Sequence, residues 1–406
     1  MKSKINAHIL INICLVVLLL GCGNVRKKEE IVLTETEGIP RQLEYVTIKS
    51  ANHHAESLFL KDVATGDVIR GEKLAQENPD QDTTSYIFPI SISANAKRTF
   101  SVLDSDPDQN EKPEEHPLQV SGENMAITVE NEYFVADFNT NSSKAKKGLY
   151  PGQLAGIFIK KKNVLLKREQ NNMHWAPNFQ KEQSGDYKTI GHANLDHAKI
   201  TQNNPYKLEM VKEGRVEGYE EIDLWGKYEF FAGLPYFMYS STMSFNEDAN
   251  LFLLRNNEMT MDKLFTHLVF PDSTGKNKEI ILYGDEKELD SLANAPLAHD
   301  IHWVGFINKP LGYGLISLQL YSDNTHKNGG ESTLFGHNMK MTKSMNEGRY
   351  WDRRLIDNHN TLVSKGSTYR EKNAYLVLDD LDDIDGKIAN YFKCLSHPIV
   401  IQYPSE

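Results

Sequence analysis

YEEIDLWGKYEFFAGLPYFMYSSTMSF, residues 219–245, decides the fold. Its first half places Ile222, Leu224, Tyr228 and Phe230 at every second position, and its second half is rich in aromatic residues. This spacing is typical of a strand that buries one face, and the Gly and Pro between the halves indicate a turn. The stretch therefore predicts two neighbouring antiparallel strands.

The same pattern recurs along most of the chain. Short runs of β-branched and aromatic residues between turn residues begin at Glu44 and continue to NAYLVLDD near residue 380. Apolar residues at helical spacing are rarer, the clearest being Ile388, Tyr391, Phe392 and Leu395. We expect an all-β fold, a large antiparallel β-sandwich with long loops and few short helices.

The composition divides the chain after its first hundred residues. DSDPDQNEKPEEHP, residues 104–117, is acidic and proline-rich and has no apolar period. We expect an N-terminal β-strand region at residues 41–103, a linker or exposed loop at 104–117, and the main β-sandwich domain at 118–406.

The N-terminus resembles a bacterial lipoprotein signal. Lys2 and Lys4 precede an apolar run at residues 9–20, and Leu19 stands three positions before Cys22. The run is too short for a comfortable membrane span. We expect a signal peptide at residues 1–21, an acylated Cys22, a tether at residues 22–40, and a lipid-anchored outer-membrane protein that faces the cell surface or the periplasm.

The charge balance limits the partners. The formal charge is −11, and removal of Lys2 and Lys4 with the signal lowers it to about −13. An acidic chain is a poor ligand for DNA or RNA, whose backbones require a basic surface, so we expect no nucleic-acid partner. The sequence also lacks a Walker loop, a Rossmann glycine pattern, a nucleophile elbow and a zinc-protease motif, and we expect no cofactor and no metal.

Two polar stretches resist the strand pattern. Residues 167–205 carry MHWAPNFQ, and residues 323–360 carry GRYWDRRLIDNH. Structureless loops of this length are uncommon unless they serve a function, and disordered segments are poor in aromatic residues. We expect both stretches to be ordered loops that line a cleft.

Three groups of residues within or near these stretches could carry chemistry. His174 could exchange a proton beside Trp175, whose indole suits the apolar face of a sugar ring. Tyr187 and His192 follow closely in the sequence. An ordinary aromatic loop anchor is an equally good interpretation of the four residues.

The second group is LLRNNEMTMDKLFTHLVF, residues 253–270. Arg255, Glu258 and His267 are ionisable residues between apolar runs, where unpaired charge is costly. On a regular strand, Arg255 and Asn257 would face one side and Asn256 and Glu258 the other. Either Glu258 or His267 transfers protons, or Arg255 forms an ordinary ion pair on a solvated face.

The third group is the arginine-dense stretch at residues 348–359. Arg353 and Arg354 offer bidentate donors beside Tyr350 and Trp351, as recognition of a sugar carboxylate or sulfate requires. A structural role with Asp352 and Asp357 as partners is about equally well supported.

Four stretches together resemble a family of bacterial lipoproteins and secreted proteins that are found with polysaccharide-degrading enzymes. They are PRQLEYVTIKS (40–50), AGLPYFMYSSTMSF (232–245), LRNNEMTMDKLFTHLVF (254–270) and YWDRRLIDNHNTLVSKGSTYREKNAYLVL (350–378). The family includes an ulvan oligosaccharide dehydratase. The strand-rich layout is also similar to the super-sandwich of galactose mutarotase-like proteins and several polysaccharide lyases.

The resemblance implies β-elimination on a uronate within an acidic oligosaccharide or polysaccharide. We expect the acid and base to come from the catalytic candidates His174, Glu258 and His267. Trp175 would stack on the sugar, Tyr187, His192 and Arg255 would orient it, and Arg353 or Arg354 would pair with its carboxylate. The most direct implication is a dehydratase that releases water. The alternatives are a polysaccharide lyase, a non-catalytic glycan-binding lipoprotein, a mutarotase-like epimerase on a neutral sugar, and, with less support, a hydrolase.

Overall fold

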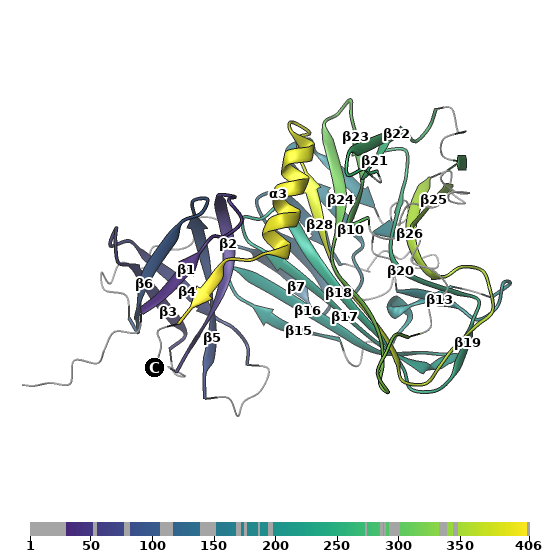
Figure 1. Ribbon diagram of the computed structural model, residues 1–406, viewed down its shortest axis with the longest axis horizontal. Helices are drawn as coiled ribbons and strands as arrows, with labels where there is room; N and C mark the ends of the chain where they lie inside the picture. The colour runs from purple at the N-terminus through teal and green to yellow at the C-terminus, as the bar shows by residue number, and fades with distance from the viewer. Residues whose placement is uncertain are drawn as a thin grey trace, which may run out of the picture.

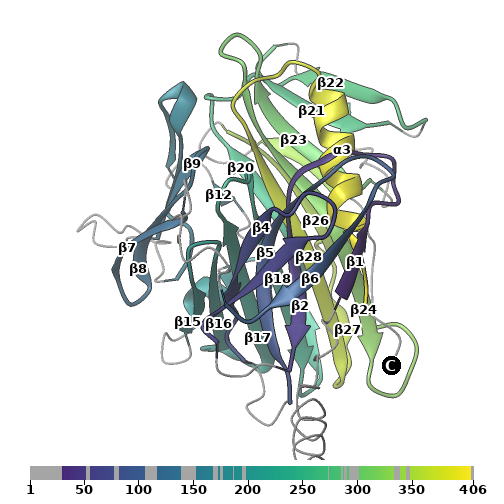
Figure 2. The ribbon, with the colours of Figure 1, turned by 90° about the vertical axis from the view of Figure 1, so that its left-hand side faces the viewer.

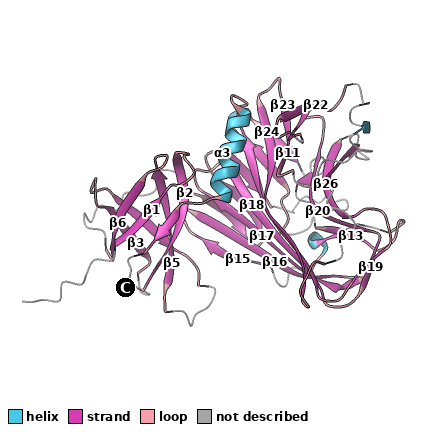
Figure 3. Ribbon diagram, in the orientation of Figure 1, coloured by secondary structure: helices cyan, strands magenta, loops and turns pink. Residues whose placement is uncertain are grey.

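The computed structural model describes residues 30–51, 55–76, 82–105, 117–138, 152–167, 172–173, 177–185, 187–193, 198–272, 274–284, 287, 290–291, 301–332, 339–343 and 348–403. Antiparallel strands dominate this part of the chain, and one longer helix lies among them (Figures 1 and 3). The expected all-β fold, a large antiparallel sandwich, is confirmed.

The first sheet has seven strands and is formed mainly by the N-terminal region. Its order is β2 (Arg41–Ser50), β5 (Thr84–Ile92), β4 (Val68–Lys73), β3 (Ser57–Asp62), β6 (Lys97–Leu103), β1 (Glu30–Thr34) and β29 (Val400–Gln402). Strand β1 lies inside the segment expected to be a tether, because Ile31 and Leu33 alternate into the core of this sheet. The tether interpretation therefore does not hold for residues 30–34.

The central sheet has nine strands. Its order is β15 (Ala198–Asn203), β16 (Lys207–Val216), β17 (Tyr219–Phe231), β18 (Tyr236–Phe245), β28 (Ser367–Leu378), β24 (Tyr313–His326), β23 (Trp303–Asn308), β21 (His267–Pro271) and β22 (Asn277–Ile281). Strands β17 and β18 are the two predicted from residues 219–245, and they pair antiparallel from Ile222–Phe245 to Phe230–Phe237.

Two smaller sheets cover one face of the central sheet. One consists of β11 (Val164–Lys167), β10 (Gly156–Ile159), β9 (Phe134–Asp137), β8 (Ala126–Glu130) and β7 (Gln119–Glu123). The other, called the β20 sheet below, consists of β14 (Lys188–Thr189), β13 (Asn178–Gln180), β20 (Leu253–Met261), β26 (Arg349–Ile356) and β25 (Met339–Lys343), with β12 (Asn172–Met173) also paired to β20.

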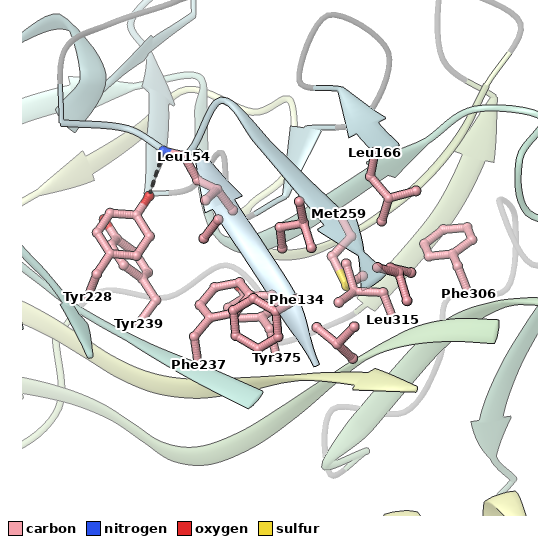
Figure 4. Close-up of a cluster of buried hydrophobic side chains, with 14 of the residues drawn as sticks. Phe134, Leu154, Leu166, Tyr228, Phe237, Tyr239, Met259, Phe306, Leu315 and Tyr375 are labelled. Atoms are coloured by element: carbon pink, nitrogen blue, oxygen red, sulfur yellow. Dashed lines mark hydrogen bonds between the residues drawn. The ribbon is translucent and has the colours of Figure 1, made fainter. Parts of the chain in front are cut away.

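Packing between these layers forms the main core. Phe134 meets Phe237 and Tyr375 of the central sheet, and Leu166 lies further along the same cluster near Phe306 (Figure 4). Met259 of β20 belongs to this cluster. The rings of Phe237 and Tyr375 are stacked with centroids 5.1 Å apart. Close packing of side chains this large contributes much of the hydrophobic stabilisation of a sandwich.

The opposite face of the central sheet meets helix α3 (Ile384–Ser396) and the N-terminal sheet (Figures 1 and 2). This is the expected closing helix, and Ile388, Tyr391, Phe392 and Leu395 contact the core on that face. The remaining elements are short: the 3-10 helices η1 (Lys160–Lys162) and η2 (Ile190–His192), and a two-stranded sheet of β19 (Ala249–Leu251) and β27 (Thr361–Val363).

The two stretches expected to be long loops are partly strands. Residues 167–205 supply β12–β15, and residues 323–360 supply the end of β24 and all of β25 and β26. The sequence pattern does not predict strand β26, because charged side chains occupy several of its buried positions and form ion pairs there. The usual alternation of apolar and polar residues is therefore absent. Strands from both stretches nevertheless flank β20 in one sheet, so the two stretches do come together.

Candidate functional site

Strands β20 and β26 lie side by side in the β20 sheet and carry most of its charge (Figure 1). On β26, Trp351 packs in the main core, and Arg353 reaches Gln319 and Glu371 of the central sheet. Successive side chains of a strand point to opposite faces. Asp352 and Arg354 therefore occupy the other face, which is called the outer face below.

A β-bulge at Asn257 changes which side chains of β20 share a face. Asn256 is opposite Arg353, Glu258 is opposite Asp352, and Asn257 has no partner between them. Its φ is 45°, in the left-handed region that Asn tolerates better than most residues. As a result Arg255 and Glu258 are both on the outer face, with Arg255 Nη1 3.3 Å from Glu258 Oε2. The expectation from a regular strand, which separated these two residues, is wrong.

The side chain of Asn257 fixes this bulge from the inner face. It donates to Ser317 Oγ at 3.0 Å and to Asn373 Oδ1 at 2.8 Å, and it accepts from the Tyr375 hydroxyl at 2.8 Å. All of these groups are buried. The bulge is thus held by a hydrogen-bonded network between the two sheets.

We expect Asn257→Gly to lower the free energy of unfolding by about 1–3 kcal/mol, because it leaves buried partners of Asn257 without hydrogen bonds. Asn257→Val should lower it by a further 1–3 kcal/mol or so, because a β-branched residue is strained at positive φ. Urea denaturation measures both effects. Asn358→Gly is the control, at an exposed position with a φ of 52°. A Val variant as stable as the Gly variant would contradict the assignment of the bulge.

Ion pairs connect the charged residues of the outer face. The carboxylate of Asp352 is fully buried, with Oδ2 2.9 Å from Arg255 Nε and Oδ1 2.9 Å from Arg354 Nε. Arg354 also pairs with Asp357 at 2.6 Å and donates to the Tyr350 hydroxyl at 3.1 Å. The term arginine–carboxylate cluster is used below for Arg255, Glu258, Asp352, Arg354 and Asp357.

Glu258 is the proton-transfer candidate in this cluster. Asn178 Nδ2 donates to its Oε2 at 2.7 Å, and the Thr260 hydroxyl donates to its Oε1 at 3.3 Å. Burial is the main cause that raises the pKa of Glu258; the charge of Asp352 raises it further, whereas Arg255 and Asn178 act to lower it. A carboxyl group with a raised pKa keeps its proton closer to neutral pH than an ordinary one, as acid–base chemistry requires.

Two aromatic rings flank Arg255 of the cluster. The guanidinium carbon of Arg255 is 5.1 Å from the ring centroid of Tyr187 and 5.5 Å from that of Tyr350. Tyr187 is 43% exposed and Tyr350 is partly buried. The outer face therefore combines a buried acid, two guanidinium groups and an accessible aromatic ring.

The structure brings together Tyr187, Arg255, Glu258 and Arg354 of the expected site. Arg353 is on the inner face, 3% exposed, and is separated from them by the sheet itself. His174, Trp175 and the lipidation candidate Cys22 lie outside the described residues.

The other two histidine candidates have local partners. His192 ends η2, where its Nδ1 is 3.1 Å from the backbone nitrogen of Thr189 in a capping box. His267 is on β21 of the central sheet, where its Nδ1 is 2.7 Å from Thr266 Oγ1 and its Nε2 is 3.4 Å from Glu279 Oε1. These contacts of His267 do not include the arginine–carboxylate cluster, and the proposed roles of both histidines rest on the sequence alone.

Sequence reasoning missed Glu371, the most strongly perturbed acid of the inner face. It is 3% exposed, and its Oε1 is 3.7 Å from Arg353 Nε. Burial raises its pKa from 4.5 to about 7, and Arg353 and hydrogen bonds from Asn373 and Gln319 only partly offset that effect. In the sequence it stands in STYREKNAYLVL among polar residues that resemble an exposed strand face.

This pKa predicts a pH-dependent stability. A folded-state pKa above the unfolded one means that the contribution of Glu371 is fully present below about pH 4.5 and is lost as the pH rises through about 7. Between about pH 5 and pH 8, wild-type protein should lose about 2–3 kcal/mol more unfolding free energy than Glu371→Gln, because one pKa unit corresponds to about 1.36 kcal/mol. Urea titrations at several pH values measure this difference, and parallel curves for the two proteins would refute it.

The described residues were also compared with the requirements of a metal site and of a membrane-spanning helix. They contain no group of three His, Cys, Asp or Glu side chains placed to hold a metal ion. None of their helices is both long and apolar enough to cross a membrane.

Comparison with known proteins identifies the fold class. No family model matches the sequence, and no curated protein does so. Among solved structures, an α-mannosidase from Enterococcus faecalis V583 aligns over 94% of this chain with a TM-score of 0.55 and 11% sequence identity. The match covers 46% of the mannosidase, so the chain spans about half of that protein's length. Identity this low shows a shared fold and nothing more.

Two aldose epimerase structures are also similar, at lower scores. A galactose 1-epimerase from Lactobacillus acidophilus NCFM aligns with a TM-score of 0.31 and 8% identity, over 65% of this chain and 98% of its own. A putative aldose 1-epimerase from Klebsiella pneumoniae aligns with a TM-score of 0.36 and 8% identity, over 88% of this chain and 96% of its own. These scores are too low to support an argument. The expected galactose mutarotase-like class therefore stays a prediction, whereas the all-β sandwich itself is observed.

Proposed function

We propose that the protein is a carbohydrate-active enzyme that performs acid–base chemistry on uronate-containing oligosaccharides at the arginine–carboxylate cluster. The observation that carries the proposal is Glu258, a buried acid with a raised pKa that is held by Asn178 and Arg255. The fold shared with a mannosidase is compatible with this class of substrate.

The reaction we propose is β-elimination. A base removes the proton from the carbon next to the sugar carboxylate, the bond to the oxygen on the following carbon breaks, and a double bond forms between the two carbons. If that oxygen leaves with a proton as water, the enzyme is a dehydratase, and if it leaves as a sugar hydroxyl, the enzyme is a lyase. Glu258 transfers one of these protons, and the guanidinium groups disperse the charge that builds on the carboxylate.

The charges of the cluster are compatible with an anionic sugar. When Glu258 is protonated, Arg255 and Arg354 balance Asp352 and Asp357, so a uronate meets no net negative charge. Tyr187 offers the exposed ring on which a sugar can stack. These two features together favour an acidic sugar with an apolar ring face.

One observation favours a second candidate, a mutarotase-like epimerase that acts on a neutral sugar. Both guanidinium groups already pair with carboxylates, so a substrate carboxylate would have to share them. An epimerase needs an acid and a base but no group that binds a substrate carboxylate. Its product has the same mass as its substrate, which separates the two proposals experimentally.

The deciding experiment is mass spectrometry of lyase-generated ulvan oligosaccharides after incubation with the purified mature protein. Loss of one water from intact oligomers supports the dehydratase, and shorter unsaturated fragments support the lyase. An unchanged mass together with altered anomeric signals in NMR spectra supports the epimerase. Binding with no product of any kind favours a glycan-binding protein and contradicts the proposed enzyme.

We also propose that Cys22 anchors the protein to the outer membrane through lipid, as the Leu19–Cys22 motif suggests. Cys22→Ser should block lipidation, and the protein should fail to incorporate labelled palmitate. Cys394→Ser is the matched control, because Cys394 is a free cysteine of α3. Equal labelling of the Cys22 variant and the wild type would exclude this anchor.

A further inference from the structure

The N-terminal sheet, the central sheet and helix α3 meet on the side of the central sheet opposite the β20 sheet (Figure 1). Residues of all three line a cavity. Its volume is about 540 Å³. Much of its wall is apolar and includes Leu43, Phe231, Met238, Leu320 and Leu395. A cavity of this size at a junction between layers is in the range of small-molecule sites.

Two tyrosines line this cavity with hydroxyl groups that the protein does not satisfy. Tyr236 is 8% exposed, and its ring makes an edge contact with that of Tyr391 at 6.0 Å between centroids. Within the described residues, neither hydroxyl has a hydrogen-bond partner. Both hydroxyl groups line the cavity, so each can donate a hydrogen bond to a polar atom of a ligand bound there.

The charged groups around the cavity differ in how they are paired. Arg41 binds Glu35 at 3.0 Å and Glu44 at 2.9 Å, and Lys387 is paired with Asp380. The Lys372 amine makes no hydrogen bond or ion pair with the described residues. Its charge only acts at longer range to lower the pKa of Glu229. One cation at the cavity wall is therefore available to a negative group.

We propose that this cavity binds a small amphipathic carboxylate, such as a medium-chain fatty acid or an aromatic acid. Its apolar body lies against Phe231, Met238 and Leu320, and its carboxylate faces Lys372 and the tyrosine hydroxyls. This site does not depend on the sugar chemistry proposed for the opposite side of the sheet.

The test is isothermal titration calorimetry of the purified mature protein with three probes: decanoate, 3-phenylpropanoate and the neutral analogue decanol. Wild-type protein should bind at least one of the two acids. Lys372→Met should weaken binding of that acid by roughly tenfold or more, because hydrogen bonds to charged groups are the stronger class, and it should leave decanol binding nearly unchanged. The two acids distinguish an aliphatic ligand from an aromatic one.

Two further variants locate the ligand. Leu320→Trp fills part of the cavity and should abolish binding of all three probes, whereas Leu311→Trp, at an exposed position, should not. Lys276→Met is the control for the loss of a surface lysine. Circular dichroism and urea denaturation establish that each variant is folded. The proposal is overturned if neither acid binds, or if the wild type and a folded Leu320→Trp variant bind equally well. The role of the cation is overturned if Lys372→Met binds the acid as tightly as the wild type does.

Discussion

Glu258→Gln should slow product formation from uronate oligosaccharides by about 10²–10⁴-fold, the usual contribution of a positioned acid or base. The amide keeps the shape of the side chain and an oxygen that can accept from Asn178 and Arg255, but it cannot transfer a proton at neutral pH. Substrate binding should change much less, so we expect kcat to fall and KM to stay nearly the same.

The matched control for this substitution is Glu279→Gln. Glu279 is also on a strand and also pairs with a cation, Lys309, but it is outside the cluster. Its variant should retain wild-type activity. If both variants turn over substrate at the wild-type rate, Glu258 is not the proton-transfer group.

A large effect on stability is expected from Asp352→Asn. Asp352 is fully buried and neutralises Arg255 and Arg354 together. An amide cannot neutralise them, and removing one partner of a buried ion pair typically costs about 3–5 kcal/mol because the other charge stays buried. Urea denaturation of the purified variant measures this loss.

Asp357→Asn is the appropriate comparison for that measurement. Asp357 binds the same arginine, but its side chain is 26% exposed and water can replace it. Asp357→Asn should lower the free energy of unfolding much less than Asp352→Asn does, because exposed ion pairs contribute about 0–1 kcal/mol. Equal losses in the two variants would show that burial of Asp352 does not govern the stability of the cluster.

The strands were predictable because the burial pattern is local. In the first part of β17 and the last part of β18 every second residue is buried, and the sequence shows this directly in Ile222, Leu224 and Met243. Helix α3 was predictable for the same reason, from the spacing of its apolar residues. The order of the strands in the sheets depends on contacts between distant segments. Alternation of apolar and polar residues predicts each strand but not which strands pair.

The site was predictable in its residues but not in its geometry. The sequence indicated Arg255, Glu258 and Arg354, and it placed Arg353 beside them as a substrate-binding candidate. Arg353 and Arg354 are adjacent on β26 and point to opposite faces of the sheet, and only the packing of Trp351 in the core determines which of the two faces inward. Asn178 belongs to the site because β13 pairs with β20, a contact that the residues around it do not suggest.

The bulge at Asn257 is the decisive feature that alternation cannot predict. RNNE, residues 255–258, contains no glycine to mark a left-handed position, and a regular strand would place Arg255 and Glu258 on opposite faces. The signal that could have found it is the pair of asparagines, because Asn tolerates positive φ better than most residues.

The most direct test of the proposed site is a crystal structure of Glu258→Gln with a bound uronate oligosaccharide. The proposal predicts a sugar on the outer face of the β20 sheet, with its carboxylate within hydrogen-bond distance of Arg255 or Arg354 and its ring against Tyr187. An oligosaccharide bound on another face of the protein, with the arginine–carboxylate cluster unliganded, would contradict it.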